Sequence, residues 1–553
     1  MRIPGRRPAR SLGGLLSIGV LVVVVACTRP PVGPPLPTTT APPAPRTNVV
    51  RIITDDQDVS SQWVMAKTQQ LLTAKGVQFT DSTVSLSLCC PSRVTHLTGQ
   101  YAHNHNVWDV AGPVGGYANF AQPENSLAPW LKAGGYTTAH VGKYLNGYNP
   151  AAAAQVPPGW DDWFAMVEPP SGTYPYYGYT VSDNGTSRTY GTADEDYVTN
   201  VLSDRAVNQL RSMEASGKPF FLDYWPTAPH YGPGRDTTTH FGPVAAPAYE
   251  QANPGAQAPR TANYRPAVNG IPQGLQDLGA YLESVTGTPD FEQNLDGSYR
   301  DALNSLLSVD DSIERLVNEL QASGQLDHTL IIFTSDNGMM WGNHGLTLMK
   351  WEPYEESLRV PLVMRGPGIP QGVTSDRPVS NIDIVPTILQ ATGVTAGRTV
   401  DGKALLPYPT NPSTDADRAL LVESNRPDAT TTYQFGAPFN VPRFQAVRTS
   451  GFQYTEWVDG FVELFDLQLD PAEMHNLAND PNYAGNRARL SAAIAQLGSC
   501  AGAACDVMVP GLTHPGPSSG AAVNAPGPRS GPRPSPAPTP AAGDELVRSL
   551  LRS

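Results

Sequence analysis

Short apolar runs separated by polar, turn-forming segments predict alternating strands and helices. Residues 49–53 form a run rich in β-branched residues, typical of a buried strand. Residues 330–333 are a second apolar strand-like run, and residues 219–225 are also predicted to form a strand. Residues 84–88 are also strand-like, and residues 62–75 are compatible with a helix. The alternation favours the α/β class, and 553 residues leave room for two packed units.

Acidic and amide side chains follow two of these predicted strands. Asp55 and Asp56 come shortly after the first strand, and Asp336 and Asn337 follow the strand at 330–333. Crowded carboxylates repel one another, and an oxygen-coordinated divalent cation relieves that repulsion. Because ligands gather at the carboxyl ends of strands in α/β sheets, the two segments together predict one metal site. For the first segment alone, a solvated acidic turn is the competing interpretation.

The amino-terminal segment has the pattern of an export signal. Residues 1–26 combine a basic leader with an apolar run that is shorter than the ~20 residues of a membrane span. The sequence VVAC at 24–27 resembles a bacterial lipobox, with Cys27 as the lipidated first residue of the mature chain. An ordinary signal peptide is the alternative, and the leader is compatible with the general or the twin-arginine export route.

Segments of biased amino-acid composition flank the predicted core at both ends. Residues 27–47 are rich in Pro and Thr and predict an extended linker, and residues 510–553 predict a disordered tail rich in Pro and Gly. We therefore expect a lipoprotein anchored in a bacterial cell envelope and facing outward. Cys500 and Cys505, just before the tail, could close a small disulfide loop in that oxidising compartment.

The net charge of −13 argues against nucleic acid as a partner, because a phosphate backbone requires a basic surface. An acidic protein can nevertheless bind a small anion at a locally positive site. The charge therefore narrows the class of partner without excluding an anionic substrate.

One cysteine segment carries the most specific information. The sequence CCPSR at 89–93, followed by LTG at 97–99, places Cys89 and Arg93 near the start of a run that can form a helix. Free backbone N–H groups at a helix start attract anions. A buried pair of neighbouring cysteines or a half-cystine is the ordinary interpretation. The pattern C-x-P-S-R-x-x-x-L-T-G, however, resembles the signature of the sulfatase family.

This resemblance implies that a formylglycine-generating enzyme oxidises Cys89 to Cα-formylglycine, with Cys90 at the variable position. It implies one Ca²⁺, held by the modified residue and the acidic clusters: Asp55, Asp56, Cys89, Asp336 and Asn337. It also implies a set of catalytic and sulfate-binding residues. Besides the cysteine signature, they lie in the motifs GKY at 142–144, APHYGP at 228–233 and HGL…K…YEESLRVP at 344–361. The residues are Arg93, Lys143, His230, Lys350 and His344.

Some motif positions leave alternatives open. His344 could instead brace its loop, and His103, in the segment HNHNV at 103–107, could contact substrate or serve packing. Many family members have a histidine two residues after the lysine of the second signature, where this chain has Leu145, so Asn146 is a candidate substitute. The combined motifs most resemble the N-acetylglucosamine-6-sulfatase-like branch.

The resemblance covers roughly residues 48–497 and implies an alkaline-phosphatase-like α/β fold. Such a fold has a large mixed sheet between helices, here a catalytic domain at 48–400, and a smaller C-terminal antiparallel sheet subdomain at 401–509. The implied reaction is hydrolysis of a sulfate monoester, of a saccharide or another small molecule, to an alcohol and inorganic sulfate. One hydroxyl of the hydrated aldehyde attacks sulfur, and the second expels sulfate from the sulfated enzyme.

Two other functions remain compatible with the sequence. The first is a phosphate or phosphonate monoester hydrolase on the same fold, using the same formylglycine and a different metal. The second is a catalytically inactive lipoprotein that binds sulfated glycans. The second is disfavoured because a binding module has no use for an oxidisable cysteine beside the cations Arg93, Lys143 and Lys350.

Overall fold

The computed structural model describes residues 46–235, 241–265, 270–286, 291–408, 415–425, 442–516 and 518. The predicted signal segment with Cys27, nearly all of the predicted linker and most of the predicted tail lie outside these residues. None of the helices in the described ranges is long and apolar enough to cross a membrane.

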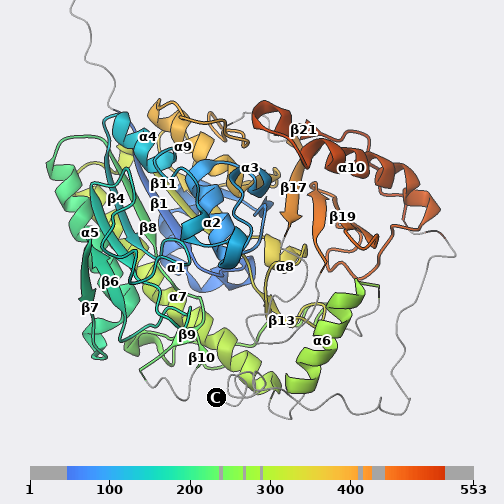
Figure 1. The fold of residues 1–553 in the computed structure, drawn as a ribbon, viewed down its shortest axis with the longest axis horizontal. Coiled ribbons are helices and arrows are strands. Elements are labelled where there is room, and N and C mark those ends of the chain that lie inside the picture. Colours follow the sequence, from blue (N-terminus) through green and yellow to red (C-terminus); the bar gives the residue numbers. More distant parts are fainter. Residues whose placement is uncertain are drawn as a thin grey trace, which may run out of the picture. The chain divides into compact units, whose positions relative to one another are not determined.

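A ten-stranded mixed sheet forms the centre of the fold (Figure 1). Its strands lie in the order β15 (Val373–Ser375), β2 (Val77–Phe79), β14 (Leu362–Arg365), β11 (Thr329–Ser335), β1 (Asn48–Thr54), β8 (Phe220–Trp225), β4 (Thr137–Gly142), β5 (Asp162–Met166), β6 (Thr180–Asp183) and β7 (Thr186–Thr189). The strands from β11 to β5 run parallel, and antiparallel pairs flank them on both sides.

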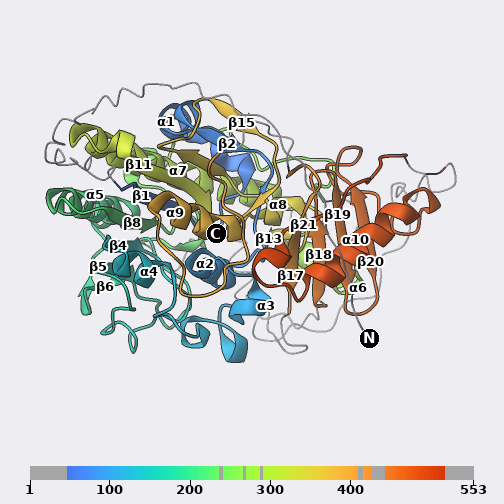
Figure 2. The same ribbon diagram turned by 90° about the horizontal axis from the view of Figure 1, so that it is seen from above.

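Helices cover both faces of this sheet, which explains why β1 is buried along its whole length. Val50 and Ile52 pack with α1 (Ala66–Leu71), α5 (Val198–Ala215) and α7 (Phe291–Ala322). Val49 and Ile53 point the other way, toward α2 (Cys89–Thr98), α4 (Leu127–Ala133) and α9 (Ile384–Thr392), because successive side chains of a strand alternate between faces. Figure 2 shows α1 and α7 on one side of the central strands and α2 and α4 on the other.

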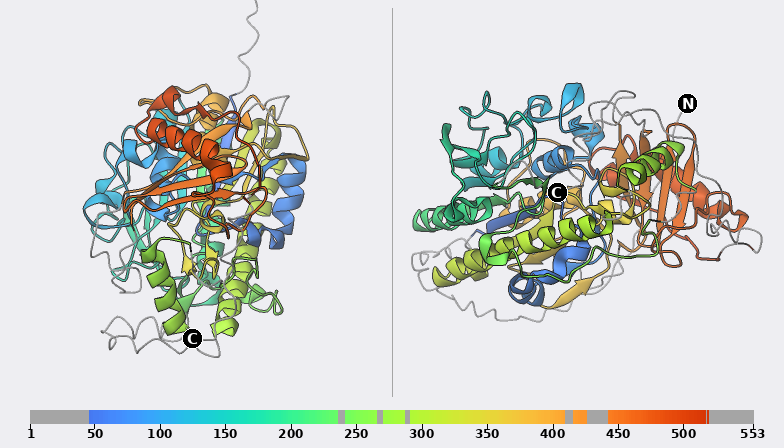
Figure 3. Two further views of the ribbon diagram at one scale, coloured as in Figure 1. Left: turned by 90° about the vertical axis from the view of Figure 1, so that its right-hand side faces the viewer. Right: turned by 90° about the horizontal axis from the view of Figure 1, so that it is seen from below.

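A second, five-stranded antiparallel sheet follows in the order β20 (Val462–Asp466), β19 (Phe452–Trp457), β18 (Phe444–Arg448), β17 (Arg418–Ser424) and β21 (Val507–Met508). One face packs on α10 (Ala484–Leu497), which lies across the sheet in Figure 3 (left). The other face shares an apolar cluster with Cys89, Trp108 and α6 (Gln273–Thr286). The small sheet is therefore packed directly against the segment that carries Cys89.

The remaining elements are short. The helices are α3 (Ala102–His105) and α8 (Glu355–Leu358), and the two-stranded pairs are β3 (Ser82–Thr83) with β16 (Val379–Ser380), β9 (Gly232–Pro233) with β10 (Phe241–Gly242), and β12 (Met340–Trp341) with β13 (Thr347–Met349).

These elements confirm the predicted fold class, with a large mixed sheet between helices and a smaller antiparallel sheet. Two local predictions were wrong. Residues 84–88 are an irregular buried segment, and only Ser82–Thr83 before them form a strand. Residues 62–75 do not form one helix, because 3-10 turns at Val59–Val64 and Thr73–Lys75 flank the short α1. Cys500 and Cys505 form the predicted disulfide. The boundary between domains at residue 400 stays a prediction.

A buried ion pair joins β1 to β8 in the middle of the sheet. Arg51 lies opposite Asp223 and donates two hydrogen bonds to its carboxylate, at 2.8 and 2.7 Å. Both side chains are fully buried. The third contact of the guanidinium is the carbonyl of His96 in α2, at 2.6 Å. A charge inside an otherwise apolar strand is thus satisfied by a neighbouring strand and a helix.

We predict that Asp223→Asn lowers the free energy of unfolding by about 3 kcal/mol or more, because it leaves Arg51 buried without its counter-charge. Urea denaturation measures the change. Asp204→Asn is the matched control: Asp204 pairs with Arg315 at the surface, and its loss should cost less than about 1 kcal/mol. Equal effects of the two substitutions would contradict the prediction.

Candidate active site

Four neighbouring parallel strands, in the order β11, β1, β8 and β4, open their carboxyl ends at one edge of the large sheet. The last residue of β1, Thr54, lies opposite Ser335 at the end of β11. Gly142 at the end of β4 lies opposite Trp225 at the end of β8. The segments that leave these four strands carry most of the candidate residues: Asp336 and Asn337, Asp55 and Asp56, His230, and Lys143.

The backbone at two of these strand ends is tightly constrained. Gly142 has φ +127°, and a Cβ there would lie 1.9 Å from the carbonyl oxygen of Trp225, so no other residue fits before Lys143. Asp56 has φ 66°, an uncommon conformation for a residue with a side chain. Its amide donates to Asp336 Oδ1 at 3.0 Å. Strain of this kind gathers at functional sites, where the surrounding structure maintains it.

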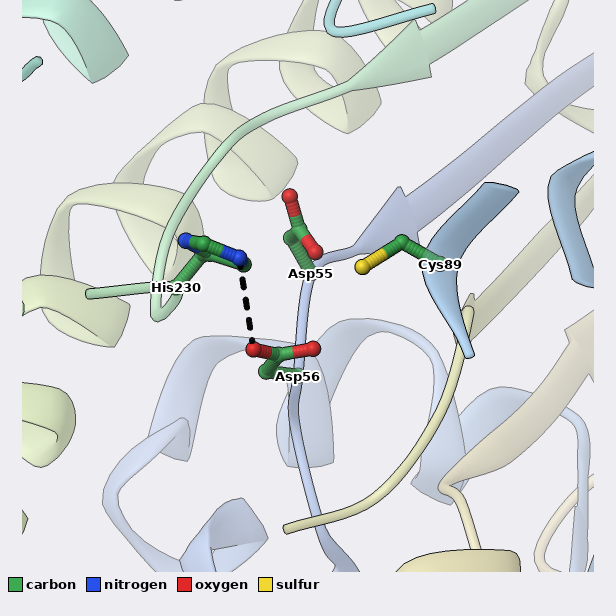
Figure 4. A group of neighbouring side chains, drawn as sticks. All are labelled: Asp55, Asp56, Cys89 and His230. Carbon is green, nitrogen blue, oxygen red and sulfur yellow. Dashed lines mark ion pairs between the residues drawn. The ribbon is translucent and has the colours of Figure 1, made fainter. Parts of the chain in front are cut away.

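Cys89 is the first residue of α2, and its side chain is 3% exposed. Figure 4 shows its sulfur pointing toward Asp55 and Asp56, with His230 on the far side of the two carboxylates. One ligand atom from each of these four residues lies within 4.8 Å of the others. Burial raises the pKa of the Cys89 thiol to about 11, although Lys143 and Lys350 lower it. An unmodified thiol would therefore remain protonated and be a poor nucleophile at neutral pH.

Three buried cations surround these carboxylates. Lys143 Nζ lies 2.6 Å from Asp55 Oδ2, and Lys350 Nζ contacts Asp56 Oδ1 and lies 2.9 Å from Cys89 Sγ. Arg93 donates to Asp336 Oδ2 at 2.8 Å and lies 3.4 Å from Asp55. The structure therefore brings together both predicted acidic clusters and the cations predicted to bind sulfate.

Burial and these charges shift the pKa values in opposite directions. Burial raises the pKa of Asp55, but Lys143 and its other cationic neighbours outweigh burial and hold this pKa well below its usual range. Burial, reinforced by the charge of Asp55, raises the pKa of Asp336 to about 7. Burial also lowers the pKa of His230 to about 4, against the opposing effect of Asp55. At neutral pH, His230 is therefore an uncharged imidazole.

Three buried side-chain oxygens at the site have no hydrogen-bond partner among the described residues: Asp55 Oδ1, Asp56 Oδ2 and Asn337 Oδ1. Nε2 of His230 lies 3.6 Å from Asp56 Oδ2. Their residues are at most 2% exposed. Buried polar atoms are normally satisfied, so such a group calls for an explanation. Carboxylate and amide oxygens are ligands for hard divalent cations, and the predicted residues Asp55, Asp56 and Asn337 fit such an ion. Asp336 uses both oxygens in the contacts with Asp56 and Arg93.

Two histidines of the sequence prediction lie elsewhere. His344 contacts Asn263 and belongs to a separate group with Glu356 and Glu473. His103 in α3 forms an ion pair with Glu423 of β17, and its other ring nitrogen lies 2.9 Å from the carbonyl oxygen of Cys500. These contacts favour the bracing interpretation for both residues. A catalytic role for His344 stays a prediction.

Sequence reasoning missed two aromatic supports. Lys143 Nζ lies over the ring of Tyr174 at 5.1 Å, and the guanidinium of Arg93 lies over Trp225 at 5.0 Å. Both rings hold a cation by cation–π attraction in a desolvated position. Trp225 could have been found because it ends the strand before the His230 segment. No motif marks Tyr174 within its tyrosine-rich segment.

The sequence model of the sulfatase family matches residues 47–394. The chain belongs to the sulfatase family. As a sulfatase it is an enzyme that hydrolyses sulfate esters, and the family predicted from the cysteine signature is confirmed. A second family, described as N-sulphoglucosamine sulphohydrolase, C-terminal, matches residues 342–499 of this sulfatase.

Known proteins resemble this sulfatase over most of their length. The N-acetylglucosamine-6-sulfatase of Homo sapiens is 33% identical over 509 residues, covering 85% of this chain and 87% of that protein. A solved structure described as a complex with its substrate D-glucosamine-2-N,6-O-disulfate has a TM-score of 0.67 and 24% identity, covering 81% of this chain and 97% of that one. A phosphonate monoester hydrolase from Silicibacter pomeroyi has a TM-score of 0.62 and 24% identity, covering 81% and 94%.

Proposed function

We propose that this sulfatase hydrolyses the sulfate ester of a sulfated glucosamine, with Cα-formylglycine at position 89 and one Ca²⁺ beside it. The observation that carries the proposal is the set of unpartnered buried oxygens next to a cysteine at a helix N-terminus, ringed by Arg93, Lys143 and Lys350. The substrate class is supported by the named activity of the human relative and by the ligand of the similar structure.

The position of Cys89 suits an anionic substrate. Free N–H groups at the start of α2 and the three cations stabilise negative charge where the sulfate oxygens would lie. When present, the hydrated aldehyde supplies one hydroxyl that attacks sulfur and a second through which sulfate is expelled. An unmodified thiol with a raised pKa offers neither hydroxyl.

Lys350 and His230, which lie on either side of Asp56, are the proposed proton-transfer residues. Lys350 keeps its proton: burial lowers its pKa, but the charge of Asp56 outweighs this and raises that pKa well above its usual range. We assign Lys350 as the donor to the leaving alcohol oxygen. Neutral His230 accepts the proton of a hydroxyl through Nε2, since its Nδ1 lies 2.6 Å from the carbonyl oxygen of Tyr231 and donates there.

The calcium ligands in this proposal are Asp55, Asp56, Asp336 and Asn337, with residue 89 as the remaining contact. When bound, the ion supplies positive charge that stabilises a sulfate oxygen as charge develops. The unpartnered oxygens Asp55 Oδ1, Asp56 Oδ2 and Asn337 Oδ1 are the direct support for this set. Lys143 and Lys350 pair with the two aspartates and would supply positive charge to the sulfate bound beside them.

We also propose lipidation at Cys27 and an outward-facing position in a bacterial cell envelope. The support is the lipobox-like sequence at 24–27, the Pro/Thr-rich linker and the disulfide Cys500–Cys505, which persists in oxidising compartments.

We predict that Cys89→Ser abolishes multiple turnover. Serine has a single hydroxyl, so attack on sulfur leaves a stable serine sulfate that cannot expel sulfate by itself. Steady-state assays with an aryl sulfate and intact-protein mass spectrometry measure the two effects. Cys90→Ala is the control, because Cys90 lies in a different apolar cluster, where alanine places no polar group in a buried position. Sustained turnover by the Cys89→Ser protein would reject the mechanism.

The calcium site leads to a second prediction. Asp56→Asn should weaken Ca²⁺ binding by about 100-fold, because the variant removes a charged ligand from a site that depends on carboxylates. Isothermal titration calorimetry after chelation measures the affinity. Asp58→Asn is the matched control: Asp58 is buried nearby, but its carboxylate accepts from the Ser60 hydroxyl and its backbone carbonyl from Ser61, so the change should leave Ca²⁺ binding unchanged. Equal Ca²⁺ affinity of all three proteins would refute the assignment.

The substrate is tested by comparing kcat/KM for glucosamine-6-sulfate, a phenyl sulfate and a phenyl phosphate. We expect the sulfated sugar to exceed both aryl esters, and the aryl sulfate to exceed the aryl phosphate by at least about 100-fold, a difference of about 2.7 kcal/mol in transition-state stabilisation. A preference for phosphate would favour the phosphate or phosphonate hydrolase. Absence of turnover in protein whose residue 89 is oxidised would favour the inactive glycan-binding protein.

A further inference from the structure

A second group of ligand side chains lies where the segment carrying Lys350 meets the small sheet: His344 and Glu473 are buried, and Glu356 is partly buried. His344 lies between β12 and β13, Glu356 lies in α8, and Glu473 follows β20. One ligand atom from each residue lies within 4.8 Å of the others, and His344 Nε2 is 4.0 Å from Glu473 Oε2. Three segments distant in sequence thus bring an imidazole and two carboxylates together.

Each carboxylate of this group has one oxygen held and the other without a partner. Glu473 Oε2 accepts from the amide of Glu355 at 2.9 Å, whereas Glu473 Oε1 is buried and has no hydrogen-bond partner in the part of the chain that the structure describes. Glu356 Oε1 accepts from Asn263 at 2.8 Å, whereas Glu356 Oε2 is likewise buried and unpartnered. The side chain of Glu473 is fully buried. Unpartnered buried carboxylate oxygens also mark the site around Asp55 and Asp56.

The nearby cation is already engaged. Arg448 forms its ion pairs with Glu355 and Asp81, and none of the ion pairs among the described residues joins it to Glu356 or Glu473. Burial, with the charge of Glu355, raises the pKa of Glu473 well above its usual range, and burial raises that of Glu356 to about 7. Two buried carboxylates this close must keep a proton or share a cation, because two unpaired buried charges are too costly.

The surroundings of His344 leave its imidazole neutral and fix the orientation of the ring. Burial lowers the pKa of His344 to about 3, so the ring is neutral, and the ring stacks on Tyr354 at 4.2 Å. Asn263 Nδ2 lies 3.1 Å from His344 Nε2, while Asn263 Oδ1 accepts from Asn343 and Thr261. Because Asn263 is oriented by these donors, its amide faces the ring, and Nε2 must be the unprotonated nitrogen. The lone pair of Nε2 therefore points at the Asn263 amide and is available to an ion that displaces this amide.

We propose that His344, Glu356 and Glu473 bind a second divalent ion, of the Zn²⁺ class. One imidazole nitrogen and two carboxylates suit Zn²⁺, whereas sites built only from oxygen suit Ca²⁺. The ion takes the place of the Asn263 amide as partner of His344 Nε2 and uses the free oxygens of the two glutamates. It ties the hairpin that leads to Lys350 and helix α8 to the turn after β20. This site is separate from the calcium ligands and independent of the chemistry at residue 89.

The test uses the full-length chain with Cys89→Ala, which removes the one thiol ligand of the catalytic cluster. The protein is treated with chelator, saturated with Ca²⁺ and titrated with Zn²⁺, and bound zinc is measured by plasma mass spectrometry. We expect about one tightly bound zinc ion per chain, and Glu473→Gln or Glu356→Gln should each weaken binding by about 100-fold or more. Glu463→Gln should retain zinc, because Glu463 is a buried carboxylate already bonded to Tyr354 and Trp457.

No zinc uptake by the Cys89→Ala chain, or unchanged uptake in both glutamine variants, would overturn the proposal in favour of a proton shared by the two carboxylates. Equal loss in Glu463→Gln would overturn it as a nonspecific effect on folding. If the glutamine variants do not fold, the melting temperature of the Cys89→Ala chain decides. Zn²⁺ should raise it in excess Ca²⁺, and no rise at saturating Zn²⁺ would also reject the site.

Discussion

Parallel pairing of β11, β1, β8 and β4 is the constraint on which the active site depends. Each strand contributes little chemistry by itself, because a single acid or lysine at a strand end is normally solvated. The register aligns the four carboxyl ends, so that residues separated by almost 300 positions in sequence share one small volume. The ion pair between Arg51 and Asp223 lies between two of these strands and ties them to the helix that begins at Cys89.

The site combines buried, paired charges with oxygens that lack a hydrogen-bond partner within the described part of the chain. Aspartates, lysines and Arg93 are buried together, and their mutual attraction offsets the cost of removing them from water. The pairing is nevertheless incomplete, since three oxygens are left without partners. A site selected only for stability would provide hydrogen-bond partners for these three oxygens. These open oxygens are the physical difference between this cluster and the pair of Arg51 and Asp223, in which both carboxylate oxygens are bonded.

The fold class and the residues of the cluster could be predicted from sequence because each leaves a local pattern. β-Branched runs mark strands such as β1, and the cysteine signature, read with the acids after two strands, identified the site. The irregular conformation of residues 84–88 could not be predicted from their apolar pattern. These apolar side chains pack against the small sheet, but their backbone does not pair as a strand. Tyr174 was missed for a similar reason: its contact with Lys143 depends on how a loop folds back. The group around His344 joins three distant segments, and spacing along the chain gives no sign of that.

The burial of Cys89 has a consequence for how the protein is made. In the folded chain this side chain is 3% exposed, beneath the small sheet and the segment around Trp108. The proposed oxidation by a separate enzyme would require access to this side chain, which the packed start of α2 does not offer. Under that proposal, modification would come before the small sheet closes over this segment. Folding and modification would then compete in time, and a chain that folded first would have the correct structure without the catalytic group.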